Sequence, residues 1–353
     1  GPYIIYVTNT QGQRRVDMNK GITVAGSIYV DYYKLIETYP KVGRLSTILD
    51  VTKTFGGCVM NTIINLAKID STIPLYAYAG VGNDENGDYL IQLLKKNGIN
   101  HEGVKRIKGE LTGFTDAMVI ESTGERTFFS TKGANRMFSY NDINFDLIQT
   151  NLFHIGYALM LDSLDKEDDD YGTVMARTLS KVQSKGIKTS IDLVSVDDER
   201  FTKVVHSCLP YCNYFIVNEI EAGKTVGLNP YGPEGKPDED NIRQIAKKII
   251  EAGVNDLVVI HAPEGGWAMT SQGDFYFVPS LILPKGYIKG SVGAGDAFCA
   301  GMLYSLYKKI PIMEGLENAN AAAACSLGGV DSTSGMKNIK EIREFYEKYK
   351  VKY

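Results

Sequence analysis

The sequence of 353 residues has few cysteines, no long apolar run and no excess of positive charge. No stretch approaches the roughly 18 apolar residues of a membrane span, so we expect no membrane partner. Lys and Arg number 38 against 42 Asp and Glu, a net charge of −4, which argues against nucleic acid as a partner. The cysteines are odd in number, widely spread and without a CxxC pair, which favours reduced thiols in a cytoplasmic protein. They are Cys58, Cys208, Cys212, Cys299 and Cys325.

Several familiar catalytic motifs are also missing. The EAGKT segment resembles the end of a Walker A loop, but Asn218 occupies the position of its first glycine. Neither GVGNDENG nor GAGDAFCAG satisfies GxGxxG, and GxSxG does not occur. The four histidines show no metal-ligand spacing. These absences argue against a P-loop, a dinucleotide fingerprint, a serine-hydrolase elbow and a histidine-based metal site.

Glycine, by contrast, is abundant, with 36 residues against 11 prolines. This excess predicts many tight turns and close backbone approaches. From residue 21 onward, strand and helix patterns alternate, which predicts an α/β fold with a doubly wound, mostly parallel sheet. β-rich stretches at about 29–54 and 104–131 break the alternation and are expected to form a small lid sheet. We treat residues 1–17 as a leader or tag of uncertain status, and 18–353 as a single domain.

The strongest chemical signal is Gly293, Ala294 and Gly295 followed by Asp296 and an apolar helical run. Glycines at a helix N-terminus leave free N–H groups at the positive end of the helix dipole, a site for phosphate or a developing oxyanion. The same field would keep Asp296 ionised, so that it could accept a proton from a substrate hydroxyl. The alternative, given about equal weight, is that Asp296 simply caps the helix.

Three weaker signals lie elsewhere in the chain. Gly57, in FGGCVMN, allows backbone to approach a ligand, with Asn61 one helical turn further on. Asn218 and Glu221 follow a strand, where polar groups can hold phosphate or the water on Mg²⁺. Asp31 follows the first strand of the domain. Each has a structural alternative: a glycine turn with a surface Asn, a helix-capping segment, and an ordinary turn aspartate.

In this order, the four signals resemble the ribokinase-like (PfkB) carbohydrate kinase family, over essentially residues 20–350. GAGD and GG-x3-N are specific as a pair, NEIE matches the family's N-x-x-E element, and GVGNDENG and TKGAN match weaker patterns. The resemblance implies a Rossmann-like ribokinase fold with a β lid. It also implies a kinase that uses ATP and Mg²⁺ to phosphorylate a hydroxymethyl group of a small sugar or sugar-like substrate, and a homodimer formed through the lid.

The resemblance also implies roles for individual residues. Asp296 would be the general base, and the N–H groups of Gly293, Ala294 and Gly295 the anion hole. The remaining positions would be Asp31, Gly57 and Asn61 at the sugar, Asn218 and Glu221 at the nucleotide phosphates and Mg²⁺ water, and Gly266 and Asn320 near the nucleotide. No side chain is predicted to ligate a metal directly.

The sequence departs from the family at two positions. Family members often have Asp or Asn six residues before the catalytic Asp, at a monovalent-cation site, and here that residue is Gly290. The resemblance therefore does not extend to K⁺ activation. The family's usual Thr-x-Gly is His261, Ala262 and Pro263 here, so we expect a different contact to the nucleotide.

Two other functions remain open from the sequence. A nucleoside kinase of the same family could use lid aromatics to stack on a base, although core packing under the lid is the favoured interpretation of these side chains. The aromatics are Tyr32, Tyr33 and Phe114. A sugar-binding regulator that has lost catalysis is the third possibility, and the intact Asp296 and GAG segment argue against it.

Overall fold

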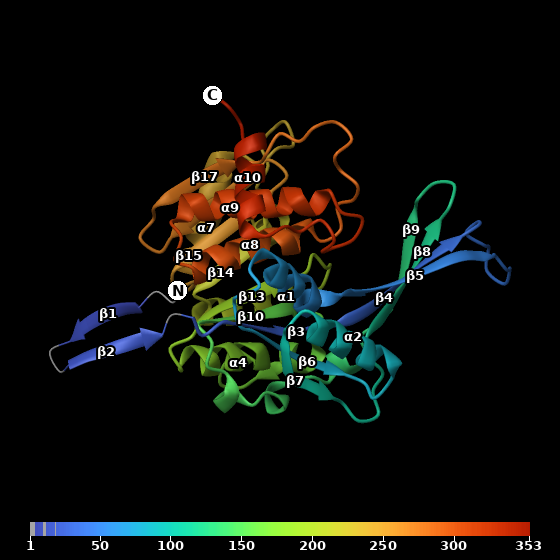
Figure 1. Ribbon diagram of the computed structural model, residues 1–353, viewed down its shortest axis with the longest axis horizontal. Coiled ribbons are helices and arrows are strands. Elements are labelled where there is room, and N and C mark those ends of the chain that lie inside the picture. Colours follow the sequence, from blue (N-terminus) through green and yellow to red (C-terminus); the bar gives the residue numbers. More distant parts are fainter. Residues whose placement is uncertain (1–3, 10–11, 18) are drawn as a thin grey trace.

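A nine-stranded sheet forms the centre of the computed structural model, which describes residues 4–9, 12–17 and 19–353 (Figure 1). Its strand order is β17-β16-β15-β14-β13-β10-β3-β6-β7, and the seven strands from β15 to β7 are parallel. In chain order the strands are β3 (Ile22–Gly26), β6 (Leu75–Val81), β7 (Asn100–Arg106), β10 (Leu152–Ala158), β13 (Lys188–Leu193), β14 (Tyr214–Asn218), β15 (Leu257–Ala262), β16 (Gly265–Thr270) and β17 (Phe275–Pro279). The predicted mostly parallel sheet is confirmed.

Helices cover both faces of this sheet, as a doubly wound fold requires. One apolar cluster packs the first face against α1 (Gly57–Ile69), α2 (Glu85–Lys96), α8 (Ala294–Tyr307), α9 (Ile312–Leu327) and α10 (Ile339–Tyr349). A second cluster packs the other face against α4 (Val174–Gln183), α5 (Phe201–Cys208), α6 (Glu219–Val226) and α7 (Glu239–Glu251). Among the helices of the described ranges, none is long and apolar enough to cross a membrane.

A separate four-stranded sheet, here called the lid, extends from the body (Figure 1). It has the order β5-β4-β8-β9 and consists of β4 (Tyr29–Ile36), β5 (Ile48–Gly56), β8 (Phe114–Ile120) and β9 (Arg126–Thr131). β4 begins three residues after β3 ends, and β5 runs directly into α1. Since parallel strands end at one edge of the sheet, the lid is attached where a ligand site is expected.

The second segment of the lid is shorter than the sequence predicts. The predicted insertion covers about 104–131, but β7 ends at Arg106 and pairs with β6 in the central sheet. The lid resumes only at Phe114. β7 joins the central sheet because α2 returns the chain alongside β6, in the usual crossover between parallel strands. The strand pattern was correct, but not the sheet to which it belongs.

Smaller elements complete the described chain. β1 (Ile4–Asn9) and β2 (Gly12–Asp17) lie in the segment that the sequence sets apart, and they pair only with each other among the described strands. A short helix, α3 (Asp162–Asp165), and the two-residue strands β11 (Glu167–Asp168) and β12 (Gly172–Thr173) connect β10 to α4.

Candidate active site

Helix α8 begins without a side-chain cap. Gly293 occupies the N-cap position with φ 79°, a left-handed conformation that favours glycine, and has no side chain to cap the first turn. A Cβ on Gly293 would lie 2.6 Å from the Cβ of Ser332, so the backbone here is also closely packed. The Ala294 N–H makes only a long contact, 3.4 Å to the Ser291 carbonyl oxygen, and the positive end of the helix dipole lies at this turn. The anion site expected here stays a prediction.

The carboxylate of Asp296 lies in the first turn of α8 and receives two hydrogen bonds. Asn61 Nδ2 donates to its Oδ2 at 3.1 Å, and the Tyr157 hydroxyl donates to the same oxygen at 2.7 Å. Burial, and then the charge of Asp192, raises the pKa of Asp296 to about 7, while the two hydrogen bonds lower it. A pKa near neutrality suits a general base, and the side chain engages α1 and β10 instead of acting only as a cap.

A cavity of about 220 Å³ opens at this helix start. It brings together the end of β14, the start of α8 and the carboxyl ends of β10 and β13. Its lining includes the predicted residues Asn218, Glu221, Gly293, Ala294, Gly295 and Asp296, together with Tyr157, Asp192, Ser195, Ser291, His261 and Cys299. The predicted phosphate-side residues are therefore assembled around one cavity.

Asn218 and Glu221 both cap a helix and line this cavity. They form a capping box at the start of α6: the Asn218 side chain accepts from the Glu221 N–H at 2.7 Å, and Glu221 Oε1 accepts from the Asn218 N–H at 3.1 Å. Ser195 donates to Glu221 Oε2 at 3.1 Å. Burial, with smaller contributions from Asp192 and Asp296, raises the pKa of Glu221 to about 8. The carboxyl groups of Glu221, Asp192 and Asp296 thus line one cavity, and a bound cation would relieve the repulsion between them.

Asp31 and Gly57, which the sequence predicts at the acceptor, lie where the lid meets α1. A Cβ on Gly56 would lie 2.4 Å from Asp31 Oδ2, so this glycine lets the carboxylate approach the backbone. Burial raises the pKa of Asp31 to about 6. Gly57 has φ 87°, and a Cβ there would lie 2.7 Å from the Ser27 carbonyl oxygen. Asn61, one turn along α1, connects this region to Asp296.

Gly266 and Asn320, predicted near the nucleotide, do not line the cavity at Asp296. A Cβ on Gly266 would lie 3.1 Å from Phe298 and 3.3 Å from Leu316. Asn320 donates from Nδ2 to the carbonyl oxygens of Val278 and Pro279 at 3.0 and 3.2 Å. Both residues therefore hold α8 and α9 against β16 and β17.

The two positions that depart from the family pattern have distinct surroundings. A Cβ on Gly290 would lie 3.5 and 3.7 Å from the carbonyl oxygens of Gly329 and Val330, in ordinary contact distance. His261 lines the cavity and stacks on Phe298 with ring centroids 4.5 Å apart. Burial lowers the pKa of His261 to about 4, so its imidazole faces the cavity in the neutral form.

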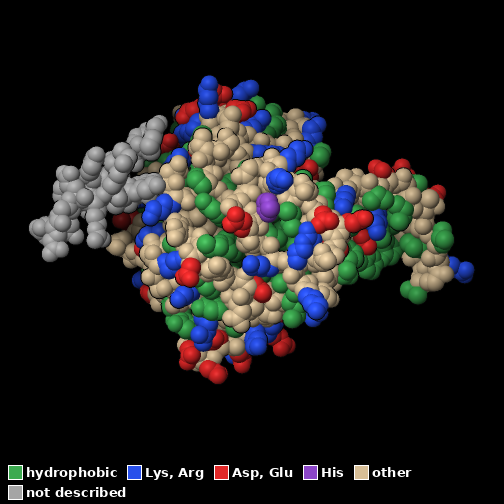
Figure 2. Space-filling view, turned by 60° about the horizontal axis from the view of Figure 1, so that its bottom comes forward, with side chains coloured by type: hydrophobic (Ala, Val, Ile, Leu, Met, Phe, Trp, Pro, Cys, Tyr) green, Lys and Arg blue, Asp and Glu red, His purple; other side chains and the backbone are tan. Residues whose placement is uncertain are grey.

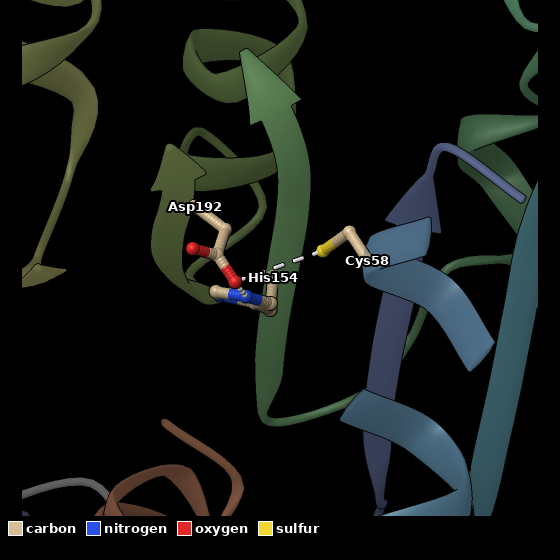
Figure 3. Close-up of side chains that lie close together, drawn as sticks. All are labelled: Cys58, His154 and Asp192. Carbon is tan, nitrogen blue, oxygen red and sulfur yellow. Dashed lines mark hydrogen bonds and ion pairs between the residues drawn. The ribbon is translucent and has the colours of Figure 1, made fainter. Parts of the chain in front are cut away.

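Sequence reasoning missed Tyr157, Asp192 and His154. Asp192, near the end of β13, lies 3.2 Å from His154 Nε2 across to β10, and Figure 3 shows both beside Cys58 of α1. Tyr157 lies at the end of β10 and contacts Asp296 directly. Tyr157 and Asp192 are polar side chains near the carboxyl ends of predicted strands, and this is the signal by which Asn218 was predicted. Applying this signal to every strand would have found Tyr157 and Asp192.

Comparison with known proteins agrees with the family resemblance found in the sequence. Residues 20–338 match the family model described as pfkB family carbohydrate kinase. The 5-dehydro-2-deoxygluconokinase of Clostridium tetani is 22% identical over 311 residues, covering 86% of each chain. The ribokinase of Arabidopsis thaliana is 24% identical over 331 residues, covering 92% of this chain and 81% of that protein.

Solved structures resemble this chain along almost its whole length. The structure of Arabidopsis thaliana ribokinase complexed with ribose and ATP has a TM-score of 0.77 at 20% identity, covering 93% of this chain and 99% of that one. A nucleoside kinase of Methanocaldococcus jannaschii has a TM-score of 0.71 at 17% identity, covering 94% and 99%. These likenesses confirm the predicted fold class.

Proposed function

The chain belongs to the pfkB family of carbohydrate kinases, as its motifs predict, and is an ATP-dependent sugar phosphotransferase; from this premise we propose the reaction and the residues that carry it. It transfers the γ-phosphoryl group of ATP to a hydroxymethyl group of a small sugar or sugar-like acceptor. The observation that supports this proposal is the position of Asp296, a half-buried carboxylate with a pKa of about 7 at the uncapped start of α8.

Asp296 acts as the general base. Both hydrogen bonds described above reach Oδ2, so Oδ1 is the oxygen that we assign to the acceptor hydroxyl. As the acceptor oxygen bonds to the γ-phosphorus, its proton passes to Oδ1, and the bond from that phosphorus to the leaving ADP oxygen breaks. Burial raises the pKa of Tyr157 well above its ordinary value, so its hydroxyl remains a donor throughout.

The N–H groups of Gly293, Ala294 and Gly295 form the anion hole for the transferring phosphoryl group. Phosphoryl transfer depends mainly on positioning and on neutralising charge that spreads over the phosphoryl oxygens. An uncapped helix start supplies fixed donors for that charge, and Asp296 in the same turn holds the acceptor in line with it. One short segment of backbone therefore positions both reactants.

Asp31, Gly57 and Asn61 hold the hydroxyl groups of the acceptor. The Asp31 carboxylate gains hydrogen bonds when sugar hydroxyls donate to it, which offsets the cost of its burial. Asn61 is already fixed on both sides, because its Oδ1 accepts from Ser332 Oγ at 2.8 Å while its Nδ2 donates to Asp296. The acceptor and the general base are thus positioned by the same turn of α1.

The family implies ATP and Mg²⁺, and the residues at the cavity fit both. Asn218 and Glu221 would orient the nucleotide phosphates and the water of Mg²⁺, since Asp192 and Asp296 give Glu221 a negative environment. Bound Mg²⁺ neutralises phosphate charge. Gly266 and Asn320 contribute by fixing the walls around the nucleotide, while Gly290 supplies no carboxylate for a monovalent cation.

Lid aromatics give no support to a nucleoside acceptor. Tyr32 and Phe114 pack edge to face with ring centroids 6.4 Å apart, and the Tyr32 hydroxyl donates to Asn86 at 2.7 Å. They are core packing under the lid. Tyr33 lies under the guanidinium of Arg126, 5.4 Å from the ring centroid. A sugar acceptor therefore remains the favoured proposal.

We also propose a homodimer formed through the lid, in the cytoplasm. The strands at the two edges of the lid, β5 and β9, are largely exposed, and Figure 2 shows hydrophobic side chains gathered on this projection. Phe128 and Phe129 are 60% and 53% exposed. Apolar patches of this kind mark interaction surfaces. All five cysteines are free thiols, which supports a reducing compartment.

The test of the reaction is Asp296→Asn, which keeps the shape of the side chain but removes the base. We expect kcat to fall by about 10²- to 10⁴-fold, with an unchanged circular dichroism spectrum and melting temperature within a few degrees. ADP release is measured with ATP, Mg²⁺ and a panel of sugars and nucleosides. Near-normal turnover by the variant would exclude Asp296 as the base, and sugar binding by the unaltered protein without any turnover would favour the regulator.

A further inference from the structure

Three potential metal ligands lie together beside the active-site cavity, and the proposed reaction does not use them as a group. They are Cys58 at the start of α1, His154 on β10 and Asp192 on β13 (Figure 3). One ligand atom from each lies within 4.8 Å of the other two, and all three residues are buried. Within the described part of the chain, this is the one such group of His, Cys, Asp and Glu side chains.

The separations between these atoms agree with a four-coordinate ion. Asp192 Oδ2 lies 3.2 Å from His154 Nε2 and 3.9 Å from Cys58 Sγ. Tetrahedral zinc binds N, O and S ligands at about 2.0 to 2.3 Å, which places the ligand atoms about 3.3 to 3.8 Å from each other. The ligand atoms of Cys58 and His154 lie within 4.8 Å of each other, so an ion could enter the cluster if these two side chains moved together by up to about 1 Å.

The imidazole is held in the orientation that a metal ligand needs. Nδ1 of His154 lies 2.9 Å from Ser190 Oγ, while Nε2 lies 3.2 Å from Asp192 Oδ2, with Cys299 Sγ 3.7 Å away and Cys58 Sγ within 4.8 Å. A histidine that binds metal through one nitrogen commonly donates from the other to a fixed acceptor. Ser190 provides that acceptor, so the site has a supporting residue as well as ligands.

The charge of the region also favours a cation. Three carboxyl groups, those of Asp192, Glu221 and Asp296, line the cavity beside the cluster, and side chains of like charge placed this close together favour a bound cation. Sulfur and nitrogen ligands select zinc-like ions, whereas Mg²⁺ requires oxygen ligands in an octahedral arrangement. The cluster therefore suits a different ion from the one that accompanies ATP.

We propose that Cys58, His154 and Asp192 bind one zinc-like divalent cation, which fastens the start of α1 to β10 and β13 beside the cavity. Sulfur, nitrogen and oxygen each form one bond to the ion. The thiol proton leaves to solvent, and the imidazole proton resides on Nδ1, facing Ser190. The ion, the thiolate and the carboxylate together carry no net charge. Asp192 also lines the cavity, so the proposed ion lies beside it.

Co²⁺ tests this site because a cobalt–thiolate bond gives a charge-transfer absorption band that oxygen ligands do not give. The full chain is titrated with Co²⁺ in excess Mg²⁺. We expect the band in the unaltered protein, its loss on adding Zn²⁺, and its loss in Cys58→Ser. Cys325→Ser is the matched control, a buried free cysteine outside the cluster, and should retain the band. Absence of the band in the unaltered protein, or its survival in Cys58→Ser, overturns the proposal.

If Cys58→Ser does not fold, Asp192→Asn gives the second test. Zn²⁺ affinity is measured by competition with a chromophoric chelator, without ATP or sugar. We expect at least about a tenfold loss of affinity, since the variant replaces a charged ligand with a neutral one. Unchanged affinity would overturn the assignment. Both measurements read the metal directly, so failure of the proposed kinase reaction would not affect them.

Discussion

The ionisation of Asp296 and its contact with Tyr157 together set the pH range in which the proposed base can act. With a pKa of about 7, raised by burial and Asp192, the carboxylate becomes protonated below neutrality. We therefore expect kcat/KM to fall about tenfold per pH unit below pH 7. The hydrogen bond from Tyr157 opposes this shift, because it stabilises the charged form.

Removing that hydrogen bond tests the assignment. In Tyr157→Phe the pKa of Asp296 should rise by about one to two units, since a hydrogen bond to a charged group contributes about 1.5–3 kcal/mol. At pH 7 kcat/KM should fall about 5- to 50-fold and recover as the pH rises. The check is a pH–rate profile of both proteins. An equal loss at every pH would instead indicate a purely structural role for Tyr157.

Asp31 is expected to reduce stability in exchange for binding the acceptor. Its folded-state pKa of about 6 lies above the ordinary 3.8, so stability falls as the pH rises through this interval. Asp31→Asn should therefore raise the free energy of unfolding above pH 6 by up to about 3 kcal/mol, and very little at pH 4. Urea unfolding at both pH values measures this, and KM for the acceptor should rise.

Asp50→Asn serves as the control for Asp31→Asn, because Asp50 is an exposed carboxylate on β5 of the same lid. It should change neither stability nor KM. A gain in stability for Asp31→Asn at pH 4 equal to the gain at pH 8 would contradict the electrostatic explanation.

At the scale of elements, the start of α8 depends on Gly293 for its conformation and for its closeness to the loop after α9. In Gly293→Ala, the new Cβ would displace Ser332, whose Oγ donates to Asn61. The positive φ alone costs about 1 kcal/mol. We expect kcat to fall about 100-fold or more, as it does when an anion-hole donor is displaced.

Gly98→Ala separates the cost of the positive φ from the effect of displacing Ser332. Gly98, just after α2, has φ 70° but nothing within 4 Å of the position of its Cβ. It should lose about 1 kcal/mol of stability from backbone strain and keep its activity. Steady-state kinetics and thermal unfolding are measured for both variants. Equal losses of activity would show that the contact between the new Cβ at position 293 and Ser332 does not affect catalysis.

The same elements show what the sequence could and could not predict. The glycine-rich start of α8 was predictable because the signal is local: a few consecutive residues determine an uncapped helix end. Tyr157 and Asp192 lie close together only because β10 and β13 are neighbours in the sheet. The residues of one strand do not determine which strand lies beside it. For the same reason β7 looked like lid in the sequence, although its partner is β6.

At the scale of the whole molecule, the lid leaves unpaired strands and apolar side chains exposed in the single chain. Both edges of its sheet lack a partner strand within the described residues, and Ile48, Leu49 and Val51 on β5 are 48%, 45% and 52% exposed. Exposed edges with apolar side chains favour association. In the proposed dimer, the lid of a second subunit would cover this surface and would hold each lid over the acceptor site of its own chain. Dimer formation would therefore favour closure of the lid over the acceptor.

Phe128→Glu combined with Phe129→Glu should therefore convert the proposed dimer into a monomer and raise KM for the acceptor. Sedimentation velocity measures the mass, and kinetics at matched chain concentrations measures KM. Leu147→Glu is the matched control, because Leu147 is 59% exposed but lies on the body, outside the lid strands. It should remain dimeric with unchanged KM. A monomeric unaltered protein, or a dimer that survives both lid substitutions, would contradict assembly through the lid. Phe128 and Phe129 follow each other on β9 and point to opposite faces of the lid, so a partner on either face would meet one introduced charge, and burying that charge should prevent assembly.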